Sequence, residues 1–251
     1  MTAPIALQLY SIREKLSNDF EAGVRTIADM GYIGVETAGF PGTTLESAAK
    51  LFKELELVVP AVHAAMPIGD SKQQTLDMMH TLGSKCIVSV LGPDNFLTID
   101  LIKKTCEKFN EASAVAIENG MSFAFHNHSW EFLPLDNRLV YEIMLDYLEP
   151  DVLFELDTYW VKTAGLNPAT VIKKLGKKAP LLHIKDGICK EGVPMTALGE
   201  GIMDFNSIVD AGKSTIEWMI VELDSCDSDM MEAIEKSYNY LTSKKLAYGK
   251  I

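Results

Sequence analysis

The sequence predicts an α/β fold, a single (β/α)8 or TIM barrel, on three observations. Short apolar runs alternate with helical patterns eight times along the 251 residues. Polar residues that suit a binding site follow four of the apolar runs in the second half of the chain. No glycine-rich turn follows the first run, where an open doubly wound sheet usually binds a nucleotide. Eight βα units in a chain of this length match a closed barrel, so we expect one domain over residues 1–251.

Strands are predicted at the short apolar runs, and helices where apolar residues recur three or four positions apart. The predicted strands are Ile5–Leu9, Gly34–Glu36, Leu57–His63, Cys86–Val90, Ser122–His126, Val152–Leu156, Leu181–Ile184 and Met219–Glu222. The predicted helices are Asp19–Met30, Leu45–Leu55, Ser71–Thr81, Leu101–Glu118, Leu139–Tyr147, Ala169–Leu175, Phe205–Ala211 and Met230–Leu241. Gly31, Gly83 and Gly120 follow helices and Asn167-Pro168 opens one, as helix ends require. Strict alternation of strand and helix predicts a parallel sheet.

The composition narrows the class of function. The chain is 47% hydrophobic and 23% charged, and its formal net charge is −12. A polyanion partner needs clustered lysine and arginine, so we expect no nucleic acid partner. An acidic chain is compatible with a divalent cation. No GxGxxG or phosphate P-loop sequence occurs, which disfavours nicotinamide enzymes and P-loop NTPases.

The sequence predicts no membrane association and a cytoplasmic location. Met1-Thr2-Ala3-Pro4 lacks the basic start of a signal peptide, and no apolar stretch approaches the ~18 residues of a membrane span. The four cysteines show no CxxC spacing, so we expect reduced thiols rather than a zinc ribbon or a disulfide framework.

Four polar segments end four successive predicted strands. They are His126-Asn127-His128-Ser129-Trp130-Glu131, Glu155-Leu156-Asp157, His183-Ile184-Lys185-Asp186 and Glu222-Leu223-Asp224. The carboxyl ends of barrel strands share one rim, so these imidazoles and carboxylates are predicted to face one concave space. Imidazole nitrogens and carboxylate oxygens are common ligands of divalent metals. The four segments therefore predict one metal site.

The second and third segments supply the clearest ligands. We expect one of the two acids Glu155 and Asp157 to face the barrel interior, and we take Asp157 as the better ligand, although a cap at the following turn would also explain it. His183 ends its strand, and Lys185 lies on the same side two residues later. Lys185 is predicted to steady a substrate hydroxyl or a developing oxyanion, with an ion pair as the alternative.

The fourth ligand stays open between two residues. Glu222 ends the last predicted strand and is taken as a ligand. Glu131 is the preferred partner on the other side, but His126 occupies the strand end itself and competes with it. His128, two residues further on, is taken with His126 as a possible proton carrier.

Four other residues are predicted to bind substrate from the opposite side of the barrel or from its rim. Glu36 and His63 end the second and third predicted strands. Trp160 and Tyr10 offer aromatic faces on which a sugar ring can stack. Gly199-Glu200-Gly201 is predicted to be a structural turn near the mouth.

Taken together, these motifs resemble the sugar phosphate isomerase/epimerase family, with its xylose-isomerase-like barrel. The likeness covers nearly the whole chain and rests on segments at six strand ends and one turn. They are Leu7–Ser11, Gly31–Glu36, His126–Phe132, Glu155–Trp160, His183–Asp186, Gly199–Gly201 and Val221-Glu222. The resemblance implies one divalent metal ion (Mn, Mg, Co or Zn) held by Glu131, Asp157, His183 and Glu222. Many relatives carry their first glutamate where this chain has His126.

The main functional hypothesis is a metal-dependent isomerase or epimerase of a sugar or keto-sugar. Glu131 and Glu222 would move a proton next to a carbonyl that the metal polarises, with Lys185 steadying the substrate. The alternative is a lyase or dehydratase of a keto-sugar or keto-inositol, in which His126 or His128 donates a proton to the leaving group. A second alternative is a non-catalytic sugar-binding barrel. The expected partner is a small sugar, and a homo-oligomer is possible.

Overall fold

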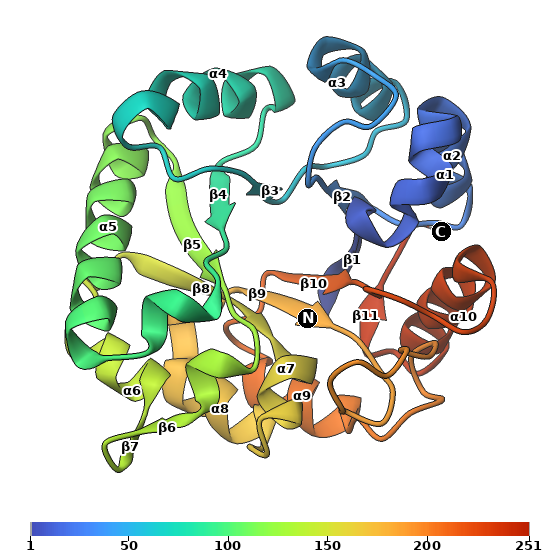
Figure 1. Cartoon of the computed structure of the whole chain (residues 1–251). Coiled ribbons are helices and arrows are strands. Elements are labelled where there is room, and N and C mark those ends of the chain that lie inside the picture. The colour runs from blue at the N-terminus through green and yellow to red at the C-terminus, as the bar shows by residue number, and fades with distance from the viewer. Residues whose placement is uncertain (1, 251) are drawn as a thin grey trace.

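The computed structural model describes residues 2–250, and its centre is a barrel of eight parallel strands with helices outside it (Figure 1). The barrel strands are β1 (Ala3–Gln8), β2 (Gly34–Glu36), β3 (Val62–His63), β4 (Cys86–Ser89), β5 (Ser122–His126), β8 (Val152–Asp157), β9 (Leu181–Ile184) and β10 (Trp218–Val221). Their spatial order is β2, β1, β10, β9, β8, β5, β4, β3. The predicted (β/α)8 barrel is confirmed.

The barrel is nearly closed between β2 and β3. Two parallel bridges join the two sides there, Gly34 to Val58 and Thr37 to Val62. The predicted strand Leu57–His63 is shorter in the structure because Pro60 interrupts it. Proline has no backbone N–H for the ladder, so the pairing stops and resumes at Val62.

Ten helices surround the sheet in the described part of the chain. They are α1 (Arg13–Asn18), α2 (Phe20–Asp29), α3 (Leu45–Glu54), α4 (Lys72–Leu82), α5 (Ile99–Glu118), α6 (Val140–Leu145), α7 (Thr158–Thr163), α8 (Pro168–Leu175), α9 (Phe205–Gly212) and α10 (Met230–Ser243). All eight predicted helices are present. The sequence prediction lacked α1 and α7, each of six residues. It also lacked the hairpin of β6 (Pro134–Leu135) and β7 (Arg138–Leu139), and β11 (Ala247–Tyr248), which pairs with β1.

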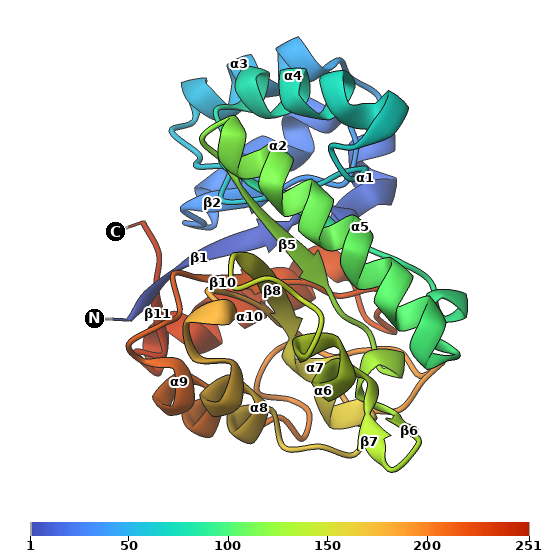
Figure 2. The same ribbon diagram turned by 90° about the vertical axis from the view of Figure 1, so that its left-hand side faces the viewer.

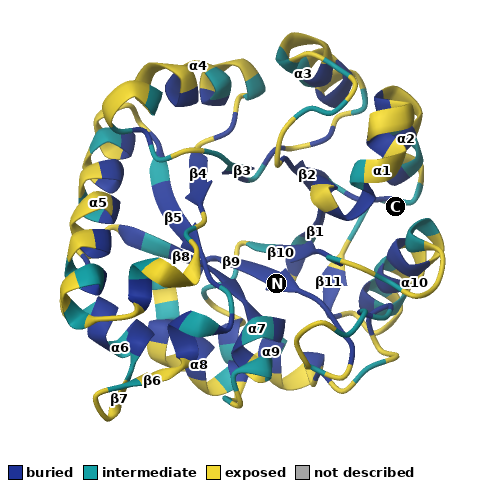
Figure 3. Ribbon diagram, viewed as in Figure 1, coloured by how far each residue is buried: buried dark blue, intermediate teal, exposed yellow. Residues whose placement is uncertain are grey.

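Each helix turns one apolar face to the sheet, so that burial is continuous on the inner side (Figure 3). The longest helix, α5, runs beside β5 (Figure 2) and buries Ile102, Cys106 and Phe109. These positions are three to four residues apart, the spacing of one helix face. Thr98 caps the start of α5 by accepting a hydrogen bond from the Leu101 N–H.

Parallel strands bring their carboxyl ends to one rim, and this determines where the polar segments meet. β5 ends at His126, β8 at Asp157 and β9 at Ile184, and Glu222 follows the last residue of β10. Within residues 2–250, none of the helices has both the length and the apolar character that crossing a membrane would require.

Candidate metal centre

Four side chains from neighbouring strands gather at the carboxyl rim of the barrel. The ligand atoms of His126, Asp157, His183 and Glu222 all lie within 4.8 Å of one another, and all four residues are buried. His183 Nδ1 lies 2.8 Å from Glu222 Oε2, and His126 Nε2 lies 3.9 Å from Asp157 Oδ2. Two imidazole nitrogens and two carboxylate oxygens are a donor set that fits a divalent cation. We call these four residues the rim cluster.

Asp157 serves two purposes with its two oxygens. Its Oδ1 accepts hydrogen bonds from the N–H groups of Tyr159 and Trp160, at 2.9 and 3.0 Å, and so caps α7. Its Oδ2 is buried and receives no aligned hydrogen bond from the described residues. The sequence left open whether Asp157 is a metal ligand or a helix cap. The structure shows that one carboxylate can do both, because each role uses a different oxygen.

Glu155 lies on the same side of β8 as Asp157, which corrects the expectation that only one of them faces the interior. Side chains two residues apart on a strand share a face. Glu155 is fully buried, and its Oε2 lies 3.1 Å from His126 Nδ1 and 2.6 Å from His63 Nε2. A second possible cation group, His63, His126, Glu155 and His183, results beneath the rim cluster.

Lys185 places its ammonium among three carboxylates. Its Nζ lies 3.0 Å from Asp157 Oδ2, 2.8 Å from Glu222 Oε2 and 2.9 Å from both oxygens of Asp224. Burial alone would lower the pKa of Lys185, but Asp157 and the other two acids raise it well above its usual value. Lys185 is therefore a permanent internal cation of this site.

The acids and imidazoles of the rim cluster differ in protonation. Burial would raise the pKa of Glu222, but Lys185 and His183 lower it well below its usual value. Burial raises the pKa of Asp157 to about 6 and lowers that of His126 well below its usual value. Burial also opposes a charge on His183, yet Glu155 and Glu36 raise its pKa well above its usual value. His126 is thus neutral, while His183 would have to release a proton in order to bind a cation.

Strand alternation and the hydrogen bonds of the Asn127 side chain determine the conformation of the segment His126-Asn127-His128. Asn127 Oδ1 accepts the Asp157 N–H at 2.9 Å, and its Nδ2 donates to the Asp157 carbonyl at 3.2 Å. This pairing extends the contact of β5 with β8 beyond the strand end. His126 and His128 then share the opposite side, and His128 stacks on Trp130 with ring centroids 4.2 Å apart. Burial, followed by Lys185, lowers the pKa of His128 to about 4.

Glu131 lies apart from the rim cluster, and His126 occupies the place that the resemblance assigned to it. The chain turns after β5 into a short 3-10 helix, Trp130–Phe132. There the buried Glu131 carboxylate accepts the His128 N–H at 2.9 Å. Burial raises its pKa to about 8. The structure therefore does not bring Glu131 together with Asp157, His183 and Glu222.

Of the four residues predicted to bind substrate, two line a cavity above the rim cluster and two, Glu36 and Trp160, do not. Tyr10 and His63 line a cavity of about 360 Å³ above the rim cluster, with Gln8, Ala38, Val90, His126, His128, Lys185, Glu222 and Asp224. Glu36 is fully buried and is not part of this lining. Trp160 is half-buried beside Lys185, whose Nζ lies 5.6 Å from the centre of its ring. The Tyr10 ring is covered on one face by the Arg13 guanidinium, 4.2 Å away.

Sequence reasoning missed Gln8, although the signal was present. Gln8 is a polar residue at the end of the first apolar strand, in the position that the ligands take on later strands. Its Nε2 donates to Glu36 Oε2 at 2.6 Å, and its Oε1 accepts the Tyr10 N–H at 3.1 Å.

The predicted turn Gly199-Glu200-Gly201 is organised by Asp186. The Asp186 carboxylate accepts four backbone N–H groups, from Gly187, Gly199, Gly201 and Met203, at 2.8 to 3.1 Å. Asp186 therefore holds the long β9–α9 loop closed, next to His183 and Lys185. The prediction of a structural turn fits this arrangement.

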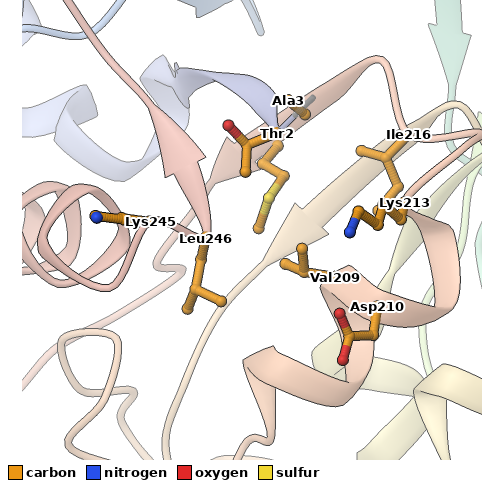
Figure 4. Close-up of a pocket in the computed structure, with 9 residues that line it drawn as sticks. Thr2, Ala3, Val209, Asp210, Lys213, Ile216, Lys245 and Leu246 are labelled. Carbon is orange, nitrogen blue, oxygen red and sulfur yellow. The ribbon is translucent and has the colours of Figure 1, made fainter.

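A separate cavity of about 150 Å³ lies at the opposite end of the barrel (Figure 4). It is formed near the start of β1 by Thr2, Ala3, Val209, Asp210, Lys213, Ile216, Met219, Lys245 and Leu246. It contains no histidine. Catalytic groups of TIM barrels lie at the carboxyl ends of the strands, so the rim cluster is the candidate functional site.

Fold and site together define a (β/α)8 barrel whose carboxyl rim carries a buried carboxylate and imidazole cluster. Among solved structures, a sugar phosphate isomerase/epimerase from Parabacteroides distasonis superposes with a TM-score of 0.85 at 23% identity, over 99% of this chain and 96% of that one. A probable 3-DHS dehydratase from Bacillus anthracis gives 0.76 at 15% identity, over 95% and 98%. An L-ribulose 3-epimerase gives 0.72 at 16% identity, over 97% and 94%.

These similarities, all at 23% identity or below, confirm the barrel fold that the sequence predicted. No family model matches the chain, and no curated protein matches it in sequence. The same fold thus carries isomerases, epimerases and a dehydratase, and the reaction has to be argued from the site.

Proposed function

We propose that the protein is a divalent-metal-dependent enzyme that isomerises or epimerises an unphosphorylated sugar or keto-sugar. The rim cluster carries this proposal, since it places two imidazoles and two carboxylates within 4.8 Å of one another beneath an open cavity. Two nitrogen donors favour manganese, cobalt or zinc over magnesium, which prefers oxygen ligands throughout. His126, Asp157, His183 and Glu222 would hold the ion.

A bound cation would supply Lewis-acid polarisation of a substrate carbonyl. The protein's own groups would do the proton work. Glu222 is ionised, because Lys185 and His183 outweigh burial and keep its pKa low, and it lines the cavity. It can therefore accept a proton from a carbon next to the carbonyl and return it to the neighbouring carbon on the same face, which isomerises the sugar. Epimerisation would need a second group to deliver a proton to the opposite face. Neutral His128, also in the cavity wall, is a second proton acceptor.

The electrostatics of the cavity argue for a substrate without a phosphate group. Lys185 is the one lysine or arginine among the cavity-lining residues named above, and three carboxylates already surround it. A phosphate dianion would face Glu222 and Asp224 without a free cationic partner, which costs free energy. The same acidity supports the expectation of no nucleic acid partner, even though an AP endonuclease from Brucella melitensis shares the fold at 14% identity.

One observation favours elimination, the second candidate reaction. The cavity wall contains His63, His126 and His128 but not Glu131, so the pair of glutamates expected for isomerisation is incomplete. A lyase needs one base and one donor for the leaving group. Burial lowers the pKa of His63, but Glu36 and Glu155 raise it above its usual value, so His63 in the cavity wall can supply that donor.

Incubation with ketoses, keto-sugars and their phosphate esters in D2O, followed by NMR, tests the proposal. Deuterium uptake next to the carbonyl without loss of a group, seen only with unphosphorylated substrates and lost in Glu222→Gln, is the expected result. Release of water or of an aglycone would favour the lyase. The control is Glu191→Gln, because Glu191 is exposed and its carboxylate accepts a hydrogen bond from Ser129 Oγ rather than from the rim cluster. Stoichiometric sugar binding without turnover under any metal would indicate a binding barrel.

A further inference from the structure

A second layer of polar side chains lies beneath the rim cluster. Glu36 and Glu155 are fully buried and are not part of the cavity lining; they lie 2.7 Å from His183 Nε2 and 3.1 Å from His126 Nδ1, respectively. We propose that Glu155 and Glu36 are positioning residues that fix opposite tautomers of His126 and His183, so that a different ring nitrogen of each faces a single metal ion. This inference rests on the proposed metal site and goes beyond it by assigning the two glutamates.

His126 uses its two nitrogens in two directions. Nδ1 lies 3.1 Å from Glu155 Oε2, and Nε2 points to Asp157 Oδ2, 3.9 Å away. A carboxylate can only accept a hydrogen bond, so Glu155 draws the proton of the neutral ring to Nδ1. The lone pair of Nε2 is then directed into the rim cluster.

His183 is arranged in the reverse sense. Its Nε2 lies 2.7 Å from Glu36 Oε2 and 3.1 Å from Glu155 Oε2, while Nδ1 lies 2.8 Å from Glu222 Oε2 in the rim cluster. When an ion replaces the proton on Nδ1, Glu36, the nearer of the two acids, keeps the proton on Nε2. Gln8 holds Glu36 in place by donating to the same Oε2 at 2.6 Å. Such carboxylate–histidine pairs behind a metal orient the ring and raise its basicity.

His63 connects this second layer to the cavity. Its Nε2 lies 2.6 Å from Glu155 Oε2, and its ring stacks on His183 with centroids 5.5 Å apart and planes 13° apart. Because His63 lines the cavity, Glu155 joins the substrate side of the site to a ligand of the ion.

The competing assignment is a second metal ion held by His63, His126, Glu155 and His183. Their ligand atoms also gather within 4.8 Å, and Oε1 of both Glu36 and Glu155 has no hydrogen-bond partner among residues 2–250. However, a neutral imidazole offers one lone pair, and His126 and His183 belong to both groups. Once these two histidines serve the rim cluster, two of the four lower ligands are lost. The geometry therefore favours one ion.

The test combines metal titration with histidine NMR on the full chain. We expect one equivalent of Mn²⁺ or Zn²⁺ to bind wild-type protein, and Glu155→Gln and Glu36→Gln each to weaken binding by about 10- to 100-fold. Nitrogen-15 spectra of the metal-free protein should show His126 as the Nδ1–H tautomer, and Glu155→Gln should redistribute this proton while Glu36→Gln leaves it in place. If the two glutamates had a merely structural role, the two substitutions would not differ in their effect on the His126 tautomer. Glu191→Gln is the matched control, expected to change neither readout.

Two results would overturn the inference. Binding of two equivalents, the second lost in Glu155→Gln, would make Glu155 a ligand. An unchanged His126 tautomer in Glu155→Gln would remove its positioning role. Failure of the proposed function is a separate outcome: wild-type protein would then bind no ion, while the tautomer measurement in metal-free protein would still test the role of Glu155.

Discussion

Asp157 shows how much chemistry one side chain can combine. Its Oδ1 caps the start of α7, directly after β8, and its Oδ2 belongs to the rim cluster. A cap needs only a hydrogen-bond acceptor, whereas a metal ligand benefits from the full charge. The two roles can therefore be separated by substitution.

We predict that Asp157→Asn loses metal binding but keeps the cap, because asparagine caps helices about as well as aspartate. Asp157→Ala should lose both, with an additional loss of about 1 kcal/mol in the free energy of unfolding. Calorimetric metal titration and urea unfolding in the presence of a chelator measure the two effects. Full metal affinity in Asp157→Asn would exclude Asp157 as a ligand, and equal stability of the two variants would exclude the cap.

For Glu131 we predict an effect on stability and none on metal binding, since its carboxylate lies outside the rim cluster. Burial raises its pKa to about 8 from a usual value of 4.5, so the folded state holds a proton that the unfolded state releases. Its contribution to stability is complete below about pH 4.5 and is lost as the pH rises through about 8. Glu131→Gln mimics the protonated form. We expect the variant to gain stability relative to wild type between about pH 5 and about pH 8.5, measured by urea unfolding.

Metal affinity should be unchanged in Glu131→Gln, within about twofold, because His126 occupies the rim cluster instead. Loss of the metal in this variant would restore the ligand set that the family resemblance implies.

At the scale of secondary-structure elements, the loop between β9 and α9 depends on one carboxylate. Asp186 gathers four N–H groups of this loop, and Gly201 lies so close that an added Cβ would come within 2.1 Å of Asp186 Oδ1 and 2.3 Å of the Gly187 nitrogen. A glycine is required here for close approach of the backbone.

We predict that Gly201→Ala destabilises the protein by about 1–3 kcal/mol, the usual cost of overpacking. Gly92→Ala is the control, since its φ is −73° and no atom lies within 4 Å of an added Cβ. It should be neutral or slightly stabilising. Urea unfolding of both variants, with hydrogen exchange at Gly187 and Met203, provides the comparison; equal effects would contradict the role of Gly201.

The helices and strands show which local features sequence patterns capture. The eight predicted helices were found because each has a regular apolar face, as in α5. By contrast, α7 was missed, because its six residues follow directly on β8 and its start depends on a side chain, Asp157, that the sequence suggests equally as a ligand. Pro60 shortened β3 for a reason visible in the sequence, the missing N–H.

For the whole molecule, the question is whether the barrel would require the proposed metal ion in order to fold. The apolar core continues through all barrel strands, and Lys185 already offsets part of the charge of Asp157, Glu222 and Asp224. Small metal-dependent folds lack such a core. The metal-free protein should therefore be folded.

We predict that chelated protein unfolds cooperatively and that Mn²⁺ or Zn²⁺ at about 100 times the dissociation constant adds about 2.7 kcal/mol to the free energy of unfolding. For a chain of this size that corresponds to a rise in melting temperature of roughly 5–10 °C. Scanning calorimetry with and without chelator measures it, and Glu222→Gln is the variant that should not respond. An unfolded metal-free protein, or no response of wild type, would contradict this account.

The sequence by itself determined the eightfold alternation of strand and helix, the ends of the strands, and thereby which polar segments meet at one rim. These features are local, since they follow from apolar periodicity and from residues that end an element. Only the tertiary structure decided that His126 rather than Glu131 completes the rim cluster, and that Glu155 and Glu36 lie beneath it. The turn after β5 and the packing of neighbouring strands set these positions, and both depend on contacts between residues far apart in the chain.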